Sequence, residues 1–346
     1  MTGAATVCLI PGDDAAPEVV EPTVEVAEAA GAQIEWRRCD IDHREATRQT
    51  IDGTDTCLFG SASGRSTWAL AYLRWGRRTY ANLRPVRHIP GAVTPLAAPD
   101  AIDFVIVREN LEDLYVGIEG ELADLARLEV SGRLGEPHEM GEGSYAIKAI
   151  TDEGSRRVAR AAFRLAEQRV ERGCGRGHVT ITSKTNMLPK TDGRFRDRCF
   201  EVAEEFPHIT TDFHIIDDFA RRLVAQPESL DVVVMPNLYG DILSDAAAGL
   251  SGGLGCAPSA GVGDDYAYFE PVHGSAPDIA GRGIINPTAQ MLSAVMMLEH
   301  LGQSAAAARL EGAIRSVYRA GTTLTPDQGG SATTAQFTAA VLHALD

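Results

Sequence analysis

The sequence lacks the features that would place the protein in a membrane or outside the cell. No segment approaches the roughly 20 consecutive apolar residues that span a bilayer. The N-terminus has no basic stretch followed by a signal-like apolar run, so we expect a cytoplasmic protein without a membrane partner. The six cysteines form no CxxC pair and no metal-like spacing to histidine, so we expect reduced, mostly structural thiols.

Positive charge is also scarce. The chain has 32 Lys and Arg against 48 Asp and Glu, a formal net charge of -16. This charge would repel phosphate backbones and anionic lipid, so no nucleic-acid partner is expected. A small anionic substrate would then need a local cluster of arginines. No GxGxxG motif follows the first strand-like run, which argues against a Rossmann dinucleotide-binding fold.

What is present indicates an α/β protein. The 346 residues are long enough for two lobes, and apolar strand-like runs alternate with amphipathic helical segments. The stretch 117–147 differs, because it is rich in Gly, Glu and small polar residues and has no long apolar period. We expect it to form an arm that packs against a partner subunit. The strand-like runs are ATVCLIPGDD, TCLFG, DFVIVRE, HVTITSK, HIIDD and DVVVMPN.

Three arginines are candidates for binding an anionic substrate: Arg74, Arg84 and Arg108. The planar guanidinium group can hold a carboxylate through two hydrogen bonds, and several such groups can hold a polycarboxylate. A single arginine is usually a surface charge. For Arg84, which precedes Pro85, and Arg108, which ends an apolar strand, the functional interpretation is favoured.

Two aspartates are candidates for binding a metal. Asp241 and Asp245 are four residues apart after an apolar run, which puts both carboxylates on one face near the start of a helix. Their oxygens could bind a divalent cation, although an aspartate near a helix start is commonly only a dipole-stabilising residue. Tyr115 and Lys184 are further candidates for a functional role. A lone tyrosine is more often a core or interface residue, and a lone lysine is more often solvated.

The segment FEPVHGSAPDIAGRGIINPTA, residues 269–289, could wrap a nucleotide. Asp278 is available to a ribose hydroxyl and would repel a ribose phosphate, which favours NAD over NADP. The alternative is an ordinary surface turn. The residues expected to line the cofactor are Glu270, His273, Gly274, Ser275, Ala276, Asp278, Ile279 and Asn286.

Seven motifs resemble the isocitrate/isopropylmalate dehydrogenase family of β-decarboxylating enzymes, which includes homoisocitrate and tartrate dehydrogenases. They occur in the family's order, and the overall likeness runs from about residue 7 to the last helices. The resemblance implies an isopropylmalate dehydrogenase-like two-lobed fold with a central mixed sheet flanked by helices. A large cofactor-binding domain would comprise 1–95 and 246–346, and a small dimerisation and substrate domain 96–245. The motifs are NLRP, VREN, EDLYVGIE, YAIKAITDEGSRRVARAAF, SKTN, NLYGDILSD and HGSAPDIAG.

The resemblance also implies a homodimer whose cleft sites use side chains from both subunits. Lys184 and Asp217 would come from the neighbour, and Asp217 would join Asp241 and Asp245 as metal ligands, with Asp218 as the alternative. The substrate would chelate Mg2+ or Mn2+ through its hydroxyl and a carboxylate. Lys184 would help to remove the hydroxyl proton while hydride passes to NAD, and after loss of CO2 Tyr115 would supply the final proton.

The sequence departs from the family at two places. The family's GDGIGPE loop is GDDAAPE here, residues 12–18. On the substrate-selecting helix, Trp68 and Leu70 replace the serine and asparagine of isocitrate enzymes, and Thr67 replaces the glutamate of isopropylmalate enzymes. Arg65 could reach a distal anion, whereas Trp68 and Leu70 would suit an alkyl group. Isocitrate, homoisocitrate, isopropylmalate and phosphonomethylmalate therefore all stay open as substrates.

Two other functions compete with this interpretation. The same metal and arginines could support a tartrate- or malate-type dehydrogenase. Heteromeric isocitrate dehydrogenases also contain non-catalytic regulatory subunits of this fold. Retention of Tyr115, Lys184 and the three aspartates argues against a regulatory subunit.

Overall fold

A ten-stranded mixed sheet runs through the computed structural model, which describes residues 4–125, 128 and 131–346. The strand order is β2-β1-β3-β12-β11-β4-β5-β10-β8-β9. Pairing is parallel towards both ends of the sheet and antiparallel where β11 meets β12 and β4, and where β4 meets β5. The strands are β1 Ala5–Ile10, β2 Ile34–Arg38, β3 Thr56–Phe59, β4 Ala81–Arg87, β5 Asp103–Glu109, β8 His178–Ser183, β9 Thr210–Ile215, β10 Val232–Met235, β11 Pro258–Val262 and β12 Ala267–Pro271.

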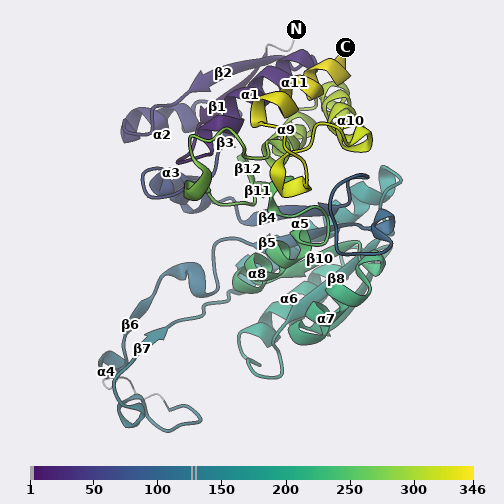
Figure 1. Ribbon diagram of the computed structural model, residues 1–346. Coiled ribbons are helices and arrows are strands. Elements are labelled where there is room, and N and C mark those ends of the chain that lie inside the picture. Colours follow the sequence, from purple (N-terminus) through teal and green to yellow (C-terminus); the bar gives the residue numbers. More distant parts are fainter. Residues whose placement is uncertain (1–3, 126–127, 129–130) are drawn as a thin grey trace.

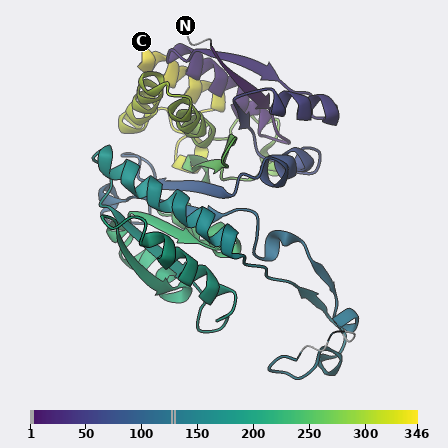
Figure 2. The same cartoon turned by 180° about the vertical axis from the view of Figure 1, so that it is seen from behind.

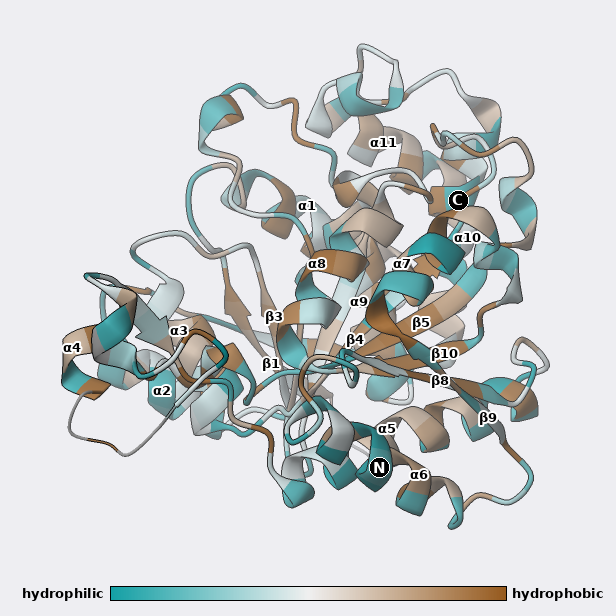
Figure 3. Ribbon diagram, turned by 90° about the horizontal axis from the view of Figure 1, so that it is seen from below, coloured by the Kyte–Doolittle hydropathy of each residue, from teal (hydrophilic) through white to brown (hydrophobic). Residues whose placement is uncertain are grey.

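Helices cover the sheet and divide the molecule into two lobes (Figure 1). The lobe with both termini is built on β1, β3 and β12, with α1 Pro17–Ala29, α2 Arg44–Asp52, α3 Thr67–Ala71, α9 Thr288–His300, α10 Ser304–Ala320 and α11 Thr334–Leu345. The second lobe contains β5, β8, β9 and β10, with α5 Asp152–Glu171, α6 Asp192–Ala203, α7 Ile216–Ala225 and α8 Asn237–Ala248. Seen from below, β5 and β10 are strongly apolar between more polar helices (Figure 3).

Local sequence explains why the second lobe's longest helix forms. The Thr151 hydroxyl accepts a hydrogen bond from the Gly154 N–H at 3.0 Å, and Asp152 and Glu153 lie in the first turn, where the helix dipole favours acidic groups. One face of α5 is buried against the sheet. Phe163 on that face stacks on Phe206 with ring centroids 5.4 Å apart, and burying such a side chain contributes about 2–3 kcal/mol.

Residues 117–125 and 131–147 project from the body of the molecule as a long arm (Figures 1 and 2). Two short strands pair in it, β6 Glu119–Glu121 and β7 Ser144–Ala146, and α4 Leu122–Leu125 follows β6. Ile118, Leu134 and Ile147 expose 49%, 76% and 41% of their surface. Apolar side chains exposed on a projecting element mark a candidate contact surface. The arm's packing against a partner stays a prediction.

One predicted strand is partly wrong. HIIDD was expected to be extended, but β9 ends at Ile215 and α7 begins at Ile216. Asp217 and Asp218 lie in the first turn of α7, where carboxylates are stabilised by the helix dipole. In the part of the chain that the structure describes, no helix has the length and apolar character needed to cross a bilayer.

Candidate active site

Arg84 and Arg108 lie side by side on the middle strands of the sheet. Antiparallel pairing sets Arg108 of β5 opposite Asn82 of β4, and Arg84 projects from the same face of β4 as Asn82 because alternate strand residues share a face. Arg84 Nε donates to Asn82 Oδ1 at 2.6 Å, and Arg108 Nε donates to Asn237 Oδ1 at 2.9 Å. Both arginines are buried, so these amides fix their orientation.

Helix α8 brings the two predicted metal-ligand aspartates to these arginines. Asp241 forms ion pairs with Arg108 and, at 3.5 Å, with Arg84, and it also accepts a hydrogen bond from the Tyr115 hydroxyl. Asp245, one helical turn further on, accepts from Arg84 Nη1 at 3.0 Å. The predicted gathering of Arg84, Arg108, Tyr115 and both aspartates is therefore observed within one chain.

Close packing of α8 on β5 is needed for this arrangement. A Cβ atom at Gly240 would lie 2.6 Å from Cγ and 2.7 Å from Cβ of Arg108. Only glycine lets the helix approach the arginine so closely. Gly240 thus positions Asp241 one residue later against the guanidinium group.

Burial and crowding of like charges set the electrostatics of the cluster. Burial, followed by the charges of Arg84 and Arg74, lowers the pKa of Arg108 to about 10. Although burial opposes it, the charge of Arg108, the hydrogen bond from Tyr115 and the charges of Arg84 and Arg74 hold the pKa of Asp241 below its usual value. The Nη2 atom of Arg108 is buried and has no hydrogen-bond partner among the described residues. The cluster therefore offers an unused donor to an anion.

Arg74 joins the cluster from the other lobe. Its Nε donates to the Tyr268 hydroxyl at 3.3 Å, and its Nη2 lies 3.7 Å from Glu270 Oε1. Burial raises the pKa of the Glu270 carboxyl. Arg74 also acts electrostatically on Arg108 and Asp241. All three predicted arginines are thus within electrostatic reach of one carboxylate.

Lys184 and Asp217 form a separate pair. The Lys184 ammonium donates to Asp217 Oδ1 at 2.6 Å and also contacts Oδ2. No hydrogen bond or ion pair joins this pair to Asp241 or Asp245 within the described part of the chain, and no set of three or more His, Cys, Asp or Glu side chains that could hold a metal occurs among the described residues.

The alternative ligand beside Asp217 is already engaged. Asp218 forms ion pairs with Arg221 and Arg222, each at 2.7 Å. Asp217 has a more exposed side chain, 63% against 41% for Asp218, and pairs with the single cation Lys184. A ligand role would require Asp217 to leave one cation and Asp218 to leave two, so Asp217 is the better placed of the two.

The predicted cofactor loop packs against the altered N-terminal loop. Ser275 Oγ donates to Asp14 Oδ2 at 2.6 Å, and the Ala15 N–H donates to the Ser275 carbonyl at 3.0 Å. Asp14 and Ala276 both have left-handed backbones, with φ of 53° and 52°. Such φ values are unfavourable for residues other than glycine, so the two loops hold each other in strained conformations.

The remaining predicted cofactor residues differ in exposure. His273 contacts Ser61 Oγ through Nδ1 at 3.1 Å, and its buried Nε2 has no partner among the described residues. Asp278 is exposed and Gly274 has open space around it, whereas Ile279 packs in a small apolar cluster beside this loop.

Asn286 is buried, and its amide donates to Asp327 at 2.9 Å. The chemistry of Asp278 and His273 suits a nucleotide, while the Asn286 amide already has a protein partner.

The three residues predicted to select the substrate side chain lie on or just before α3. Arg65 is exposed and forms an ion pair with Asp42. Trp68 lies beneath the guanidinium groups of Arg44 and Arg48, at 5.5 and 5.9 Å from the ring centroid. Leu70 packs partly buried against the neighbouring apolar cluster. Their contact with a substrate stays a prediction.

Several residues that hold the site were not anticipated from the sequence. Asn82, Asn237 and Ser244 orient the arginines, and Ser244 Oγ accepts from Arg84 at 2.7 Å. Asn237 and Ser244 lie in the motif NLYGDILSD, so the motif itself was the available signal. Asn82 begins the motif NLRP, and its partner Arg84 stands two residues later on the same strand, so the alternation of side chains along a strand was the available signal.

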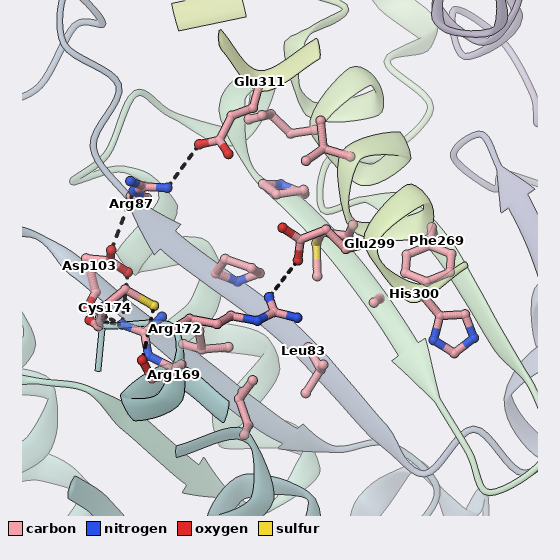
Figure 4. A pocket seen from close by; sticks show the side chains of 18 of the residues that line it. Leu83, Arg87, Asp103, Arg169, Arg172, Cys174, Phe269, Glu299, His300 and Glu311 are labelled. Atoms are coloured by element: carbon pink, nitrogen blue, oxygen red, sulfur yellow. Dashed lines mark hydrogen bonds and ion pairs between the residues drawn. The ribbon is translucent and has the colours of Figure 1, made fainter. Parts of the chain in front are cut away.

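A cavity lies on the opposite face of the sheet, between the lobes (Figure 4). It has a volume of about 550 Å³ and is lined by Leu83 and Arg87, which alternate with Arg84 along β4. Ion pairs cross it, including Arg172–Glu299 at 2.9 Å. None of the predicted site residues, all of which the structure describes, lines this cavity. It is therefore distinct from the arginine cluster.

Comparisons with known proteins agree with this geometry. A family model described as isocitrate/isopropylmalate dehydrogenase matches residues 6–341. The 3-isopropylmalate/3-methylmalate dehydrogenase of Methanocaldococcus jannaschii is 42% identical over 339 residues, covering 95% of both chains. The isocitrate/homoisocitrate dehydrogenase of Thermus thermophilus is 42% identical over 355 residues, covering 98% of both. The crystal structure of isocitrate dehydrogenase from Methylococcus capsulatus is 36% identical with a TM-score of 0.85, covering 99% of both chains.

Proposed function

Because the chain belongs to the isocitrate/isopropylmalate dehydrogenase family, we propose that it catalyses metal-dependent, NAD-linked oxidative decarboxylation of a 3-substituted malate to a 2-oxo acid and CO2. Family members are β-decarboxylating dehydrogenases that act on small hydroxy acids with NAD(P) and a divalent metal. The observation that carries the proposal is the convergence of Arg84, Arg108 and Tyr115 on Asp241.

Substrate binding is assigned to the three arginines. Their guanidinium groups suit the carboxylates of a malate, and the unpartnered Nη2 of Arg108 supplies a donor that the protein leaves unused. Arg74 comes from the other lobe, so a substrate held by all three would tie the lobes together. Removal of one arginine would leave a substrate carboxylate without its partner.

The donor set at α8 fits a hard divalent cation. Asp241 and Asp245 offer only oxygen ligands, as Mg2+ and Mn2+ prefer, and Asp217 would complete the set from a partner subunit. When bound, such a cation would polarise the substrate hydroxyl and carbonyl and stabilise negative charge after loss of CO2. Arg84 and Arg108 occupy these carboxylates in the single chain and would move to the substrate.

Proton transfers are assigned to Lys184 and Tyr115. Lys184 of the partner subunit would take the proton of the substrate hydroxyl, while hydride passes from the carbon that bears this hydroxyl to the nicotinamide. Tyr115 would then give its proton to the carbon that loses CO2. Burial and the hydrogen bond to Asp241 raise the pKa of Tyr115, so this hydroxyl stays protonated at neutral pH and can act as an acid.

The NAD assignment rests on Asp278. Its exposed carboxylate lies on the turn Pro277–Ile279, where it could accept a hydrogen bond from a free ribose hydroxyl and would repel a phosphate. We therefore expect kcat/KM with NAD to exceed kcat/KM with NADP. Asp278→Ala should narrow the difference, and a preference for NADP in the unaltered enzyme would contradict the assignment.

A dimer with shared sites accounts for the separation of Lys184 and Asp217 from Asp241. Val224 of α7 and Ile242 of α8 are 62% and 58% exposed, which supports burial of these helices against a second copy. The proposed domain division is 1–95 with 246–346, and 96–245. Mixing inactive Tyr115→Phe and Lys184→Met chains should restore activity, since one site of the mixed dimer then holds both intact residues. No restoration would contradict shared sites.

The substrate's side chain can be identified with a panel of 3-substituted malates. The two 42% identical relatives carry names with alkyl and carboxylated substrates, so identity does not separate these classes. We expect Mg2+- or Mn2+-dependent NADH formation with one class, assayed with isocitrate, homoisocitrate, isopropylmalate and phosphonomethylmalate. Arg65→Ala should weaken turnover only for a charged substituent, and Arg37→Ala, which removes another exposed and paired arginine, is the control. No NADH formation with any member would refute the proposal.

A further inference from the structure

Lysine is rare in this chain, and one lysine is held among acidic side chains that the proposed chemistry does not use. Only three of the 32 basic residues are lysines: Lys148, Lys184 and Lys190. Lys148 follows β7 at the base of the arm, beside the bridge between Asp113 and Ala149. Its ammonium group lies 3.2 Å from Asp113 Oδ1 and 2.9 Å from Asp192 Oδ2.

The carboxylate of Asp113 shapes the turn that carries Tyr115. It accepts hydrogen bonds from the N–H of Leu114 at 2.9 Å and of Leu238 at 3.0 Å. Asp113 has a φ of 69° and precedes the short turn Leu114–Val116. The position of the Tyr115 turn relative to α8 therefore depends on the place of this one carboxylate.

The carboxylate of Asp192 shapes the loop that carries Lys184. It accepts a hydrogen bond from the Lys184 N–H at 2.7 Å, and the Asp192 carbonyl accepts from Ser183 Oγ at 3.0 Å. The loop 184–191 thus closes on its own end, where α6 begins. The hydrogen bond from the Lys184 N–H to Asp192 therefore fixes the backbone position from which the Lys184 side chain extends.

One ammonium group neutralises both carboxylates. The side chains of Asp113 and Asp192 are completely buried, and that of Lys148 is 13% exposed. The Lys148 ammonium also lies 4.4 Å from the centre of the Tyr239 ring of α8. A buried carboxylate without a counter-charge is strongly unfavourable, so both aspartates depend on this lysine. Three donors on a compact charge suit partners in different directions, whereas the planar group of arginine does not.

We propose that Lys148 is a positioning residue that joins the turn of Tyr115 to the loop of Lys184. The inference rests on the proposed function, in which Tyr115 serves the site of its own chain and Lys184 serves the site of the partner. Lys148 then connects the two active sites of a dimer, because one side chain sets the place of a group in each.

The first test compares lysine variants of the full-length enzyme. Lys148→Met should lower kcat at least tenfold and change the KM for the hydroxy acid less than threefold, because the arginines that bind it are untouched. Lys148→Arg keeps the charge without the geometry and should give an intermediate kcat. Lys190→Met, in the same loop but exposed, is the matched control and should stay within twofold of wild type.

Two outcomes contradict the positioning role. One is a folded Lys148→Met dimer with kcat within threefold of wild type. If Lys148→Met does not fold, the second contradicting outcome is a wild-type kcat in Lys148→Arg. A reduced kcat in Lys148→Arg at unchanged KM would support the role.

The second test uses the mixed dimer of Tyr115→Phe and Lys184→Met chains, whose one intact site takes Lys184 from the first chain and Tyr115 from the second. Lys148→Met is added to one chain at a time. Both placements should lower kcat at least threefold. In the Tyr115→Phe chain, Lys148→Met would displace the intact Lys184, and in the Lys184→Met chain it would displace the intact Tyr115. An effect in only one placement would contradict the connection between sites. An inactive mixed dimer before this addition would instead refute shared sites, and leave the first test to judge positioning alone.

Discussion

At the scale of single residues, Asp241 is the centre of the candidate site, because Arg84, Arg108 and Tyr115 all contact it. Tyr115→Phe removes only a hydroxyl group, so we expect the fold to persist and kcat to fall by about two to four orders of magnitude, the usual size of a general-acid contribution. Steady-state kinetics with the accepted substrate measures this. Tyr145→Phe on the arm is the control, and a Tyr115→Phe enzyme with near-normal kcat would refute the assigned role.

Glu109, next to Arg108, provides a pH-dependent prediction. Burial raises the pKa of its carboxyl from 4.5 to about 7. The folded state therefore binds this proton more tightly than the unfolded state, and the resulting stability is complete below pH 4.5 and is lost as pH rises through 7. The whole effect is worth about 3 kcal/mol.

Denaturant unfolding at pH 5 and pH 8 tests this residue. The free energy of unfolding should be lower at pH 8, and Glu109→Gln should reduce the difference between the two pH values. The exposed Glu228→Gln should leave the difference unchanged. Equal pH dependence in Glu109→Gln and wild type would contradict the assignment to Glu109.

At the scale of elements, the packing of α8 on β5 decides where the carboxylates of Asp241 and Asp245, the proposed metal ligands, lie. Gly240→Ala would push a methyl group against Arg108, so we expect the free energy of unfolding to fall by about 1–3 kcal/mol and kcat/KM to fall with it. Gly312→Ala in α10, where a Cβ atom meets nothing within 4 Å, should instead stabilise by about 0.5–1 kcal/mol. Denaturant unfolding and kinetics compare the two, and a harmless Gly240→Ala would show that the close approach is not required.

Some helices and strands could be predicted from the sequence, and others could not. β1, α1 and α5 were predictable because their periodicity and ends are local, and the arm was predictable from its composition. β2, β4, β11 and β12 were not identified. β4 contains Pro85, which is tolerated because β11 pairs only with residues 81–83, and Gly261 lies in the middle of β11. Their pairing depends on residues far apart in the chain.

The site was predictable to the extent that family motifs carry it. Arg84, Arg108, Tyr115, Asp241 and Asp245 come together as expected. Lys148 lies within a quoted motif, yet its role depends on contacts with Asp113 and Asp192, which are 35 and 44 residues away. Long-range contacts of this kind cannot be read from local spacing.

At the scale of the whole molecule, the sheet separates the arginine cluster from the cavity shown in Figure 4. The arginine cluster lies on one face of β4 and β5, and the cavity crossed by Arg172–Glu299 lies on the other. Strand β4 contributes to both, because Arg84 lies in the cluster while Leu83 and Arg87 line the cavity.

The most direct test of the central claim is the ratio of CO2 released to NADH formed by the purified enzyme on its accepted 3-substituted malate. We predict one CO2 for each NADH, with both signals abolished by EDTA and restored by Mg2+ or Mn2+. NADH formed without CO2 would indicate a malate-type dehydrogenase and contradict the account, as would full activity after removal of the metal.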